Sequence, residues 1–171
     1  MVQGHSNPKR RIMILQSLRT GAFALATLVA FAAPTLAETA NTETVKNFYA
    51  AFGQNKPELL DKVLATDWVD IPPNQGQEPG RDAFKPFIAG YHTMFSDLSV
   101  VNDQIIDAGE YVIVRSTISG TQAAPFAGFA SKGRPFKVMA VDIHQFKDGL
   151  VVKTWHVEDW LSGMFQMGSF E

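Results

Sequence analysis

The sequence predicts an α+β domain in which N-terminal helices pack on one face of a curved, mostly antiparallel sheet. Two observations support this fold class. Residues 42–95 contain three segments with a helical spacing of apolar residues, whereas residues 98–157 contain four segments rich in Val, Ile and Phe that are separated by turn residues. A length of 171 residues with 46% hydrophobic content is typical of a single globular domain.

The predicted helices come first along the chain. Apolar residues recur at i, i+3, i+4 and i+7 within residues 42–52, which predicts one apolar helix face, and Gly53 follows as a stop signal. Pro57 is placed to begin a second short helix. Residues 68–71 then predict a short strand that ends before two prolines. A loop rich in turn formers leads to a third helix over residues 81–95.

The predicted strands follow the third helix, and they cover residues 98–106, 111–119, 136–146 and 150–157. A turn around Gly109, a longer loop over residues 121–135 and an Asp148-Gly149 turn separate them. The tail from Trp160 is expected to add a helical turn. Helices followed by a run of strands favour an α+β domain over an alternating α/β one.

Charge and cysteine content exclude several classes of protein. The chain has 15 basic and 17 acidic residues, for a net charge of −2, so it lacks the basic excess of a nucleic-acid-binding protein. It contains no cysteine, which excludes a disulfide framework, a thiol nucleophile and a cysteine-ligated metal.

The first 37 residues predict an export signal that precedes the domain of residues 38–171. Four basic residues between positions 9 and 19 precede an uncharged apolar run over residues 21–33, and small residues up to Ala37 offer a cleavage site. A bilayer span needs about 20 apolar residues, so a cleaved signal is favoured over an uncleaved membrane anchor. Met13 is an alternative to Met1 as the start of translation.

Cleavage near Ala37 would remove four basic side chains and no acidic ones, leaving 11 basic and 17 acidic residues. We therefore expect an acidic protein that is exported, either periplasmic or secreted. No association with the membrane is expected after the signal is removed.

The last hairpin carries the most informative polar pattern. Its Asp148-Gly149 turn allows two registers. A two-residue type I′ turn places Asp142 opposite Trp155, whereas a type I turn with Gly149 as a bulge residue places Asp142 opposite Thr154. The second register is favoured, because it separates the polar and apolar side chains onto opposite faces of the hairpin.

The polar face of that hairpin predicts a catalytic pair. This face contains Asp142, His144, Thr154, His156 and Glu158. In the favoured register His156 is the diagonal neighbour of Asp142, about 7–8 Å away between Cα atoms. The carboxylate and the imidazole could then share a hydrogen bond, which is the minimum equipment for acid–base chemistry near neutral pH. The alternative is a polar face that meets only water or a partner subunit.

These residues also resemble a known family. The similarity lies in FYAAF at 48–52, DWVD at 67–70, VDIH at 141–144 and WHVEDW at 155–160, and it covers nearly all of residues 41–169. The chain resembles the SnoaL-like polyketide cyclases, and within them the ester cyclases. The resemblance implies the fold of nuclear transport factor 2 and ketosteroid isomerase, a cone-shaped α+β barrel. It also implies a homodimer.

The resemblance implies an activity and a site as well. Family members that act on polyketides close a ring by intramolecular aldol condensation of an ester-bearing intermediate, without a metal. Their acid–base aspartate matches His156, a histidine one strand earlier matches Asp142, and an asparagine after the second helix matches Asp70. The family pair is thus present with Asp and His exchanged. The resemblance favours the bulged turn, because it requires Asp142 and His156 on the cavity side.

Two assignments of the catalytic pair remain open. In the preferred one, His156 is the acid and base and Asp142 orients it, because an ordinary histidine titrates near pH 6.5. In the other, Asp142 is the base, with its pKa raised in an apolar pocket. The predicted substrate-binding residues are Asp70, His144, Tyr49 and Trp155.

The expected function is metal-free, enolate-type chemistry, such as cyclisation or isomerisation of a carbonyl compound, in an apolar cavity. The expected partner is a small hydrophobic or carbonyl-bearing ligand. A metal site built from His144, His156 and Asp142 is not favoured, because the two histidines are separated by about four residues along the hairpin, or about 13 Å. We expect no metal and no other cofactor. The alternative function is a binding module that holds a small hydrophobic ligand and catalyses nothing.

Overall fold

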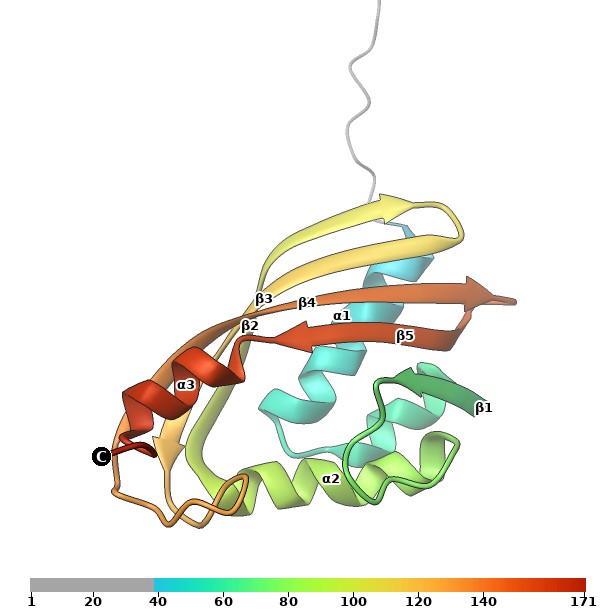
Figure 1. The fold of residues 1–171 in the computed structure, drawn as a ribbon. Helices are drawn as coiled ribbons and strands as arrows, with labels where there is room; N and C mark the ends of the chain where they lie inside the picture. The colour runs from blue at the N-terminus through green and yellow to red at the C-terminus, as the bar shows by residue number, and fades with distance from the viewer. Residues whose placement is uncertain (1–38) are drawn as a thin grey trace, which may run out of the picture. The chain divides into compact units, whose positions relative to one another are not determined.

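A computed structural model describes residues 39–171, and it shows helices packed against one face of a five-stranded sheet (Figure 1). The predicted export signal lies outside the described residues. The elements in chain order are α1 (Ala40–Gly53), the 3-10 helix η1 (Pro57–Lys62), β1 (Leu64–Ile71), α2 (Arg81–Met94), β2 (Phe95–Ala108), β3 (Tyr111–Gln122), β4 (Pro135–Lys147), β5 (Leu150–Glu158) and α3 (Trp160–Met167). The α+β fold class predicted from the sequence is therefore confirmed.

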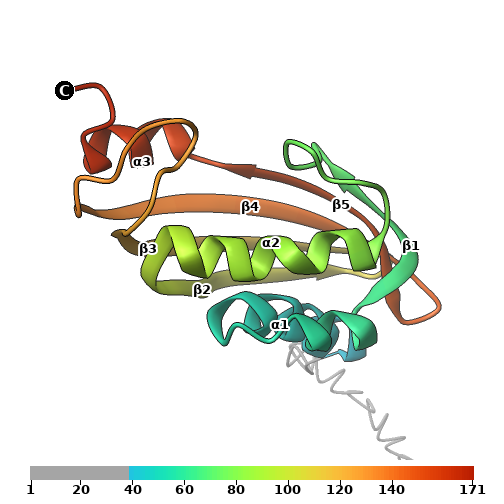
Figure 2. The ribbon, with the colours of Figure 1, turned by 90° about the horizontal axis from the view of Figure 1, so that it is seen from below.

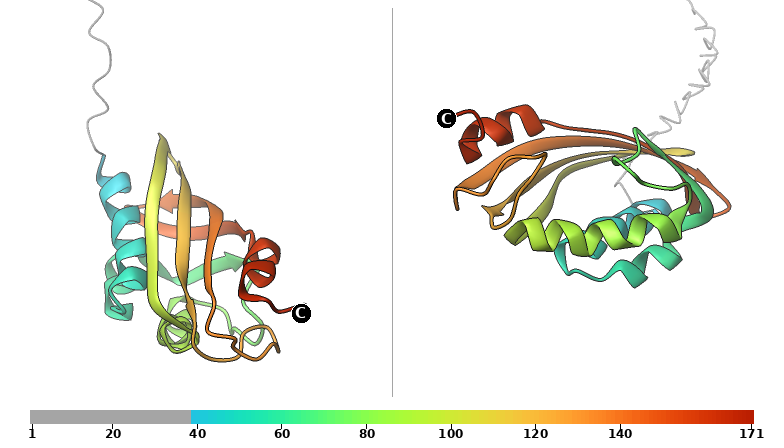
Figure 3. Two further views of the ribbon diagram at one scale, coloured as in Figure 1. Left: turned by 90° about the vertical axis from the view of Figure 1, so that its left-hand side faces the viewer. Right: turned by 60° about the horizontal axis from the view of Figure 1, so that its bottom comes forward.

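The sheet is mostly antiparallel and has the strand order β1-β5-β4-β3-β2. Strands β2 to β5 pair in sequence order as an antiparallel meander, whereas β1 pairs with β5 in parallel. Figures 2 and 3 show that the sheet is curved and that α1 and α2 lie on its concave side. The parallel pair brings the end of β1 next to the end of β5, although these segments are far apart in the sequence.

Helix α1 forms where the sequence predicts it. The Thr39 side chain accepts a hydrogen bond from the Thr42 backbone nitrogen and so caps the first turn. The predicted apolar face packs on the sheet, with Val45, Phe48 and Tyr49 all buried. Hydrophobic burial of this face fixes α1 against the strands that hold the polar pattern.

Two groups of buried residues form the core. The larger group lies between α1, η1, α2 and the sheet, and it includes Trp68, Phe84 and Ile88. The smaller group lies toward α3 and includes Phe95, Phe136 and Met167. Within residues 39–171, no helix is long and apolar enough to cross a bilayer.

The hairpin of β4 and β5 follows neither register considered from the sequence. Asp148 and Gly149 have φ angles of 52° and 81°, as a two-residue type I′ turn requires, and Lys147 pairs with Leu150. The pairing then shifts between Gln145 and Phe146, where Val152 is an extra residue in β5.

The bulge at Val152 separates the polar and apolar side chains onto opposite faces, as predicted, although the turn is not the predicted one. It places Asp142 directly opposite His156, rather than opposite Thr154 or Trp155. Because facing residues of an antiparallel pair share a side of the sheet, Asp142 and His156 both lie on the concave side, as expected.

Candidate active site

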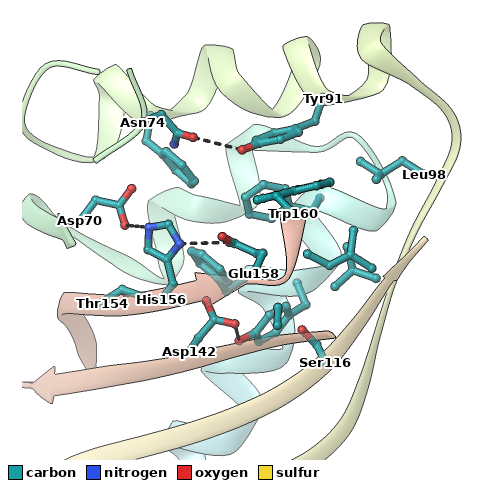
Figure 4. Close-up of a pocket in the computed structure, with 17 residues that line it drawn as sticks. Asp70, Asn74, Tyr91, Leu98, Ser116, Asp142, Thr154, His156, Glu158 and Trp160 are labelled. Atoms are coloured by element: carbon teal, nitrogen blue, oxygen red, sulfur yellow. Dashed lines mark hydrogen bonds and ion pairs between the residues drawn. The ribbon is translucent and has the colours of Figure 1, made fainter. Parts of the chain in front are cut away.

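A cavity lies between the concave face of the sheet and the two long helices (Figure 4). Together with the open solvent at its mouth, the cavity has a volume of about 670 Å³. Its lining is mostly aromatic and aliphatic, and includes Phe48, Phe84 and Trp160. Its acidic and imidazole groups are Asp70, Asp142, His156 and Glu158.

His156 is held between two carboxylates and a backbone carbonyl. Its Nδ1 lies 3.0 Å from Glu158 Oε1, and its Nε2 lies 2.8 Å from the Pro72 oxygen and 3.2 Å from Asp70 Oδ1. All three partners are acceptors, so both ring nitrogens carry hydrogen and the ring is an imidazolium. Burial opposes this charge, but the hydrogen bonds that His156 donates to Asp70 and Glu158 raise its pKa to about 11.

Asp142 is a buried carboxyl group that lines the same cavity, and only 7% of it is exposed. Burial raises its pKa to about 7, against the opposing effect of a hydrogen bond from Tyr49. The Tyr49 hydroxyl donates to Oδ2 at 2.8 Å. The other oxygen, Oδ1, is the one left to receive a proton from the cavity.

A chain of buried hydrogen bonds leads to Asp142 from behind the cavity wall. The Trp68 indole donates to Thr154 Oγ1 at 3.0 Å. The Thr154 hydroxyl lies 3.0 Å from His144 Nδ1, and His144 Nε2 lies 3.0 Å from the Tyr49 hydroxyl. Because the Tyr49 hydroxyl donates its only hydrogen to Asp142, it must accept from His144 Nε2. His144 Nδ1 then accepts from Thr154.

This order of donors requires a neutral His144, and the surroundings of that ring provide it. His144 is fully buried, and burial, with a smaller contribution from the charge of His156, lowers its pKa to about 3. Burial and the nearby Asp142 carboxylate raise the pKa of Tyr49 well above its usual value, so Tyr49 stays a donor. The chain therefore points one hydroxyl proton at Asp142.

The predicted hydrogen bond between Asp142 and His156 is wrong. Among residues 39–171, the His156 side chain donates to Asp70, Glu158 and Pro72, whereas the Asp142 side chain accepts from Tyr49. The reason is the parallel pairing of β1 with β5, which brings Asp70 to the imidazole. No local pattern in the sequence predicts the register of that pairing.

Two of the predicted substrate-binding residues do not line the cavity. His144 lies behind Tyr49 and contacts Phe48, with ring centroids 5.1 Å apart. Trp155 lies on the opposite face of the sheet, as its alternation with His156 requires, and Lys153 Nζ lies 5.2 Å from its ring centroid. The other two, Asp70 and Tyr49, do line the cavity.

Sequence reasoning also missed several groups in the cavity. Glu158 is two residues after His156 on β5 and therefore lies on the same face, so the alternating pattern contained this signal. Asn74 lies in the loop before α2 and accepts a hydrogen bond from the Tyr91 hydroxyl at 3.0 Å. No periodic pattern places such a loop residue. Ser116 and Trp160 also line the cavity.

A metal ion would have to compete with the hydrogen bonds of His156. Ligand atoms of Asp142, His156 and Glu158 all lie within 4.8 Å of one another. However, both nitrogens of the imidazole already donate to protein acceptors. A ring nitrogen must be free of hydrogen to bind a metal. The arrangement is therefore better suited to proton transfer by Asp142 beside a fixed cation.

Comparisons with known proteins agree with this architecture. Residues 43–167 match the model of the SnoaL-like polyketide cyclase family. Comparison with curated proteins found no match. TsrD from Streptomyces laurentii is 29% identical with a TM-score of 0.71, and the match covers 77% of this chain and 96% of TsrD.

Two further structures are similar. IdmH from Streptomyces antibioticus, described as a candidate polyketide cyclase, is 25% identical with a TM-score of 0.65, over 75% of this chain and 98% of IdmH. A protein from Catenulispora acidiphila with a ketosteroid isomerase-like fold, in complex with trimethylamine, is 22% identical with a TM-score of 0.59, over 74% of this chain and 92% of its own. The last match shows the fold alone. Since the family match spans most of the domain, the chain belongs to the SnoaL-like polyketide cyclases.

Proposed function

We propose that this protein is a small-molecule enzyme that removes a proton from the carbon next to a carbonyl group, with Asp142 as the base. The observation that carries this proposal is a carboxyl group in an apolar cavity with a pKa raised to about 7. A base with this pKa is partly ionised at neutral pH and basic enough to accept a proton from carbon.

In the proposed step, the α C–H bond of the substrate breaks and its proton passes to Asp142 Oδ1. The electron pair of that bond moves into the carbonyl group, which becomes an enolate. Return of the proton at another carbon gives an isomer. Alternatively, the enolate carbon attacks a second carbonyl carbon of the same molecule, so that a C–C bond forms, the π bond of that carbonyl breaks and a ring closes. The resulting alkoxide oxygen takes the proton from Asp142, which restores the base. Membership of a cyclase family favours ring closure.

The structure supports Asp142 over His156 as the base, which reverses the preferred assignment from the sequence. An imidazolium has no free lone pair, and both N–H groups of His156 are already bound to acceptors. Its role in the proposal is electrostatic. The positive charge lowers the pKa of Asp142 and so offsets the opposing effects of Glu158 and Asp70.

Hydrogen–deuterium exchange tests this proposal without knowledge of the natural substrate. The probe is 2-tetralone, an apolar bicyclic ketone, incubated with the protein in D₂O and followed by NMR at its α-carbons. We expect catalysed exchange that Asp142→Asn slows by about 10³-fold, in the range of general base catalysis. Asp67→Asn, which changes an exposed carboxylate on β1, is the matched control and should exchange at the wild-type rate.

Binding of 2-naphthol, a planar mimic of the enol, separates this proposal from the binding-module alternative. Naphthol binding together with exchange that depends on Asp142 supports the enzyme. Wild-type protein that binds naphthol but does not catalyse exchange would instead identify a binding module. Equal exchange by wild type and Asp142→Asn would show that another group is the base.

A further inference from the structure

The Ser116 hydroxyl is a buried polar group of the cavity that has no partner among residues 39–171. Ser116 is fully buried in β3, and its Oγ forms no hydrogen bond with the described residues. Its side chain lines the cavity (Figure 4). The lining also includes the apolar residues Leu98, Val100 and Ile118. Buried hydroxyl groups are nearly always hydrogen-bonded, because loss of water without a replacement partner is unfavourable. An unpaired one in a cavity therefore points to a ligand.

The position of Ser116 relates it directly to Asp142. Ser116 pairs across the sheet with Ala140, which is two residues before Asp142 on the same face of β4. The two are therefore diagonal neighbours, with Cα atoms on the order of 7–8 Å apart. If the α-carbon of a carbonyl compound contacts Asp142, its carbonyl oxygen can therefore lie close to Ser116.

Other hydrogen-bond donors beside Asp142 are already committed. Tyr49 donates to Asp142, and both N–H groups of His156 donate to protein acceptors. The Tyr91 hydroxyl donates to Asn74. Asp70 accepts from Gln77 and lies against the imidazolium, so it is not placed to donate to a carbonyl or enol oxygen. The charge that develops on a carbonyl oxygen during enolisation needs a donor aimed at it.

We propose that Ser116 donates its hydroxyl hydrogen to the substrate carbonyl oxygen whose α-proton Asp142 removes. This inference rests on the proposed function and extends it by placing the substrate in the cavity. The reacting carbonyl lies over β3 and β4, between Ser116 and Asp142. The rest of the molecule lies against the aromatic side chains of the helices. The substrate class is thus an apolar ketone or ester with one oxygen at the sheet.

The competing explanation is an ordered water molecule that serves only the fold. Asn102 is the cross-strand partner of Ser116, and its Oδ1 is likewise buried with no partner among the described residues. A water between the two side chains would satisfy both. In that case the Ser116 hydroxyl would contribute to stability and not to the rate of proton removal, and measurements of both quantities separate the two explanations.

The test measures α-proton exchange of 2-tetralone in D₂O for wild type, Ser116→Ala, Ser116→Thr and Ser119→Ala. We expect Ser116→Ala to lower kcat by about 10–100-fold, with a smaller change in KM, because the hydroxyl acts on the developing charge. Ser116→Thr, which keeps the hydroxyl, should restore most of the rate. Ser119 follows on the same strand with its side chain on the opposite face, so Ser119→Ala is the control.

Each outcome distinguishes this inference from the function on which it rests. If Ser116→Ala keeps kcat within threefold of wild type while Asp142→Asn is inactive, the proposed role of Ser116 is overturned and the proposed function stands. If Asp142→Asn is as active as wild type, the base is misassigned. If the wild type neither catalyses exchange nor binds 2-naphthol, both proposals fail. Fivefold weaker naphthol binding by Ser116→Ala, with naphthalene binding unchanged, supports the contact independently of turnover.

Discussion

His144 and His156 lie on neighbouring strands and on the same side of the sheet, yet His144 is neutral and His156 is positively charged. His144 on β4 is opposite Thr154 on β5, and His156 on β5 is opposite Asp142, which is two residues before His144 on β4. Burial lowers the pKa of His144 to about 3. His156 is also shielded from water, but Asp70 and Glu158 raise its pKa to about 11.

Hydrogen-bond partners explain this contrast better than burial does. His144 meets two hydroxyl groups, which can either donate or accept, so a neutral ring satisfies them. His156 meets only acceptors. Asp142 lies between these two environments, with a neutral donor chain on one side and a cation on the other. Burial raises the pKa of Asp142, the Tyr49 hydrogen bond and the charge of His156 lower it, and the pKa that results is about 7.

The largest loss of stability is expected when the positive charge of His156 is removed. His156→Gln leaves Asp70 and Glu158 without a positive partner, so we expect the free energy of unfolding to fall by about 3–5 kcal/mol at pH 6. Folding raises the pKa of His156 from 6.5 to about 11. Its stabilisation is therefore complete below pH 6.5 and is lost as the pH rises toward 11. Urea denaturation at pH 6 and pH 9.5 measures this dependence.

Two controls make the His156→Gln experiment decisive. The difference between wild type and variant should be smaller at pH 9.5 than at pH 6, and an equal difference at both would contradict a cationic His156. The pKa of Asp142, followed by NMR, should rise in the variant because the charge that lowers it is gone. An unchanged pKa of Asp142 would contradict the electrostatic role.

A smaller effect is expected at the neutral histidine. His144→Phe removes both ring nitrogens from the buried chain between Tyr49 and Thr154, so we expect a loss of about 2–3 kcal/mol at pH 7.5. Folding lowers the pKa of His144 to about 3, so wild-type stability from this group is present above pH 6.5 and declines as the pH falls toward 3.

The His144→Phe variant should lose that acid-dependent part of the stability. Denaturation at pH 7.5 and pH 4.5 should therefore show a difference from wild type that narrows in acid. A difference that widens in acid would mean that His144 is protonated in the native state, and the order of donors along the chain would be wrong.

The sequence predicts the fold and the polar face well because both depend on local periodicity. The spacing of Val45, Phe48 and Tyr49 marks α1, and the alternation from Asp142 to Glu158 marks the concave side of the hairpin. The alternation of polar and apolar side chains still predicts which residues share a face when the strand pairing changes, provided that each side chain stays on the same side of the sheet. The hairpin did not need the predicted turn, since a type I′ turn and a bulge at Val152 place the same residues inside.

The partners of these side chains could not be predicted, because they depend on pairings between distant segments. Asp70 reaches His156 through the parallel pairing of β1 and β5, and no turn fixes that register. Tyr49 reaches Asp142 from α1 across the core. The preference for His156 as base used the pKa of an isolated imidazole, which two neighbouring carboxylates change by several units. The face on which a residue lies can thus be predicted from nearby residues in the sequence, whereas its protonation state depends on distant ones.

The smallest expected effect concerns ligand binding by two tryptophans, which lie on opposite sides of the sheet. Trp155 lies beside His156 in the sequence but on the other face of the sheet, whereas Trp160 begins α3 and lines the cavity. We expect Trp155→Phe to bind 2-naphthol within about twofold of wild type, and Trp160→Phe to bind it about fivefold more weakly, because only the second loses aromatic contact with the ligand. Fluorescence titration of both variants measures this difference. Equal weakening by the two variants would contradict the placement of Trp155 and Trp160 on opposite sides of the sheet.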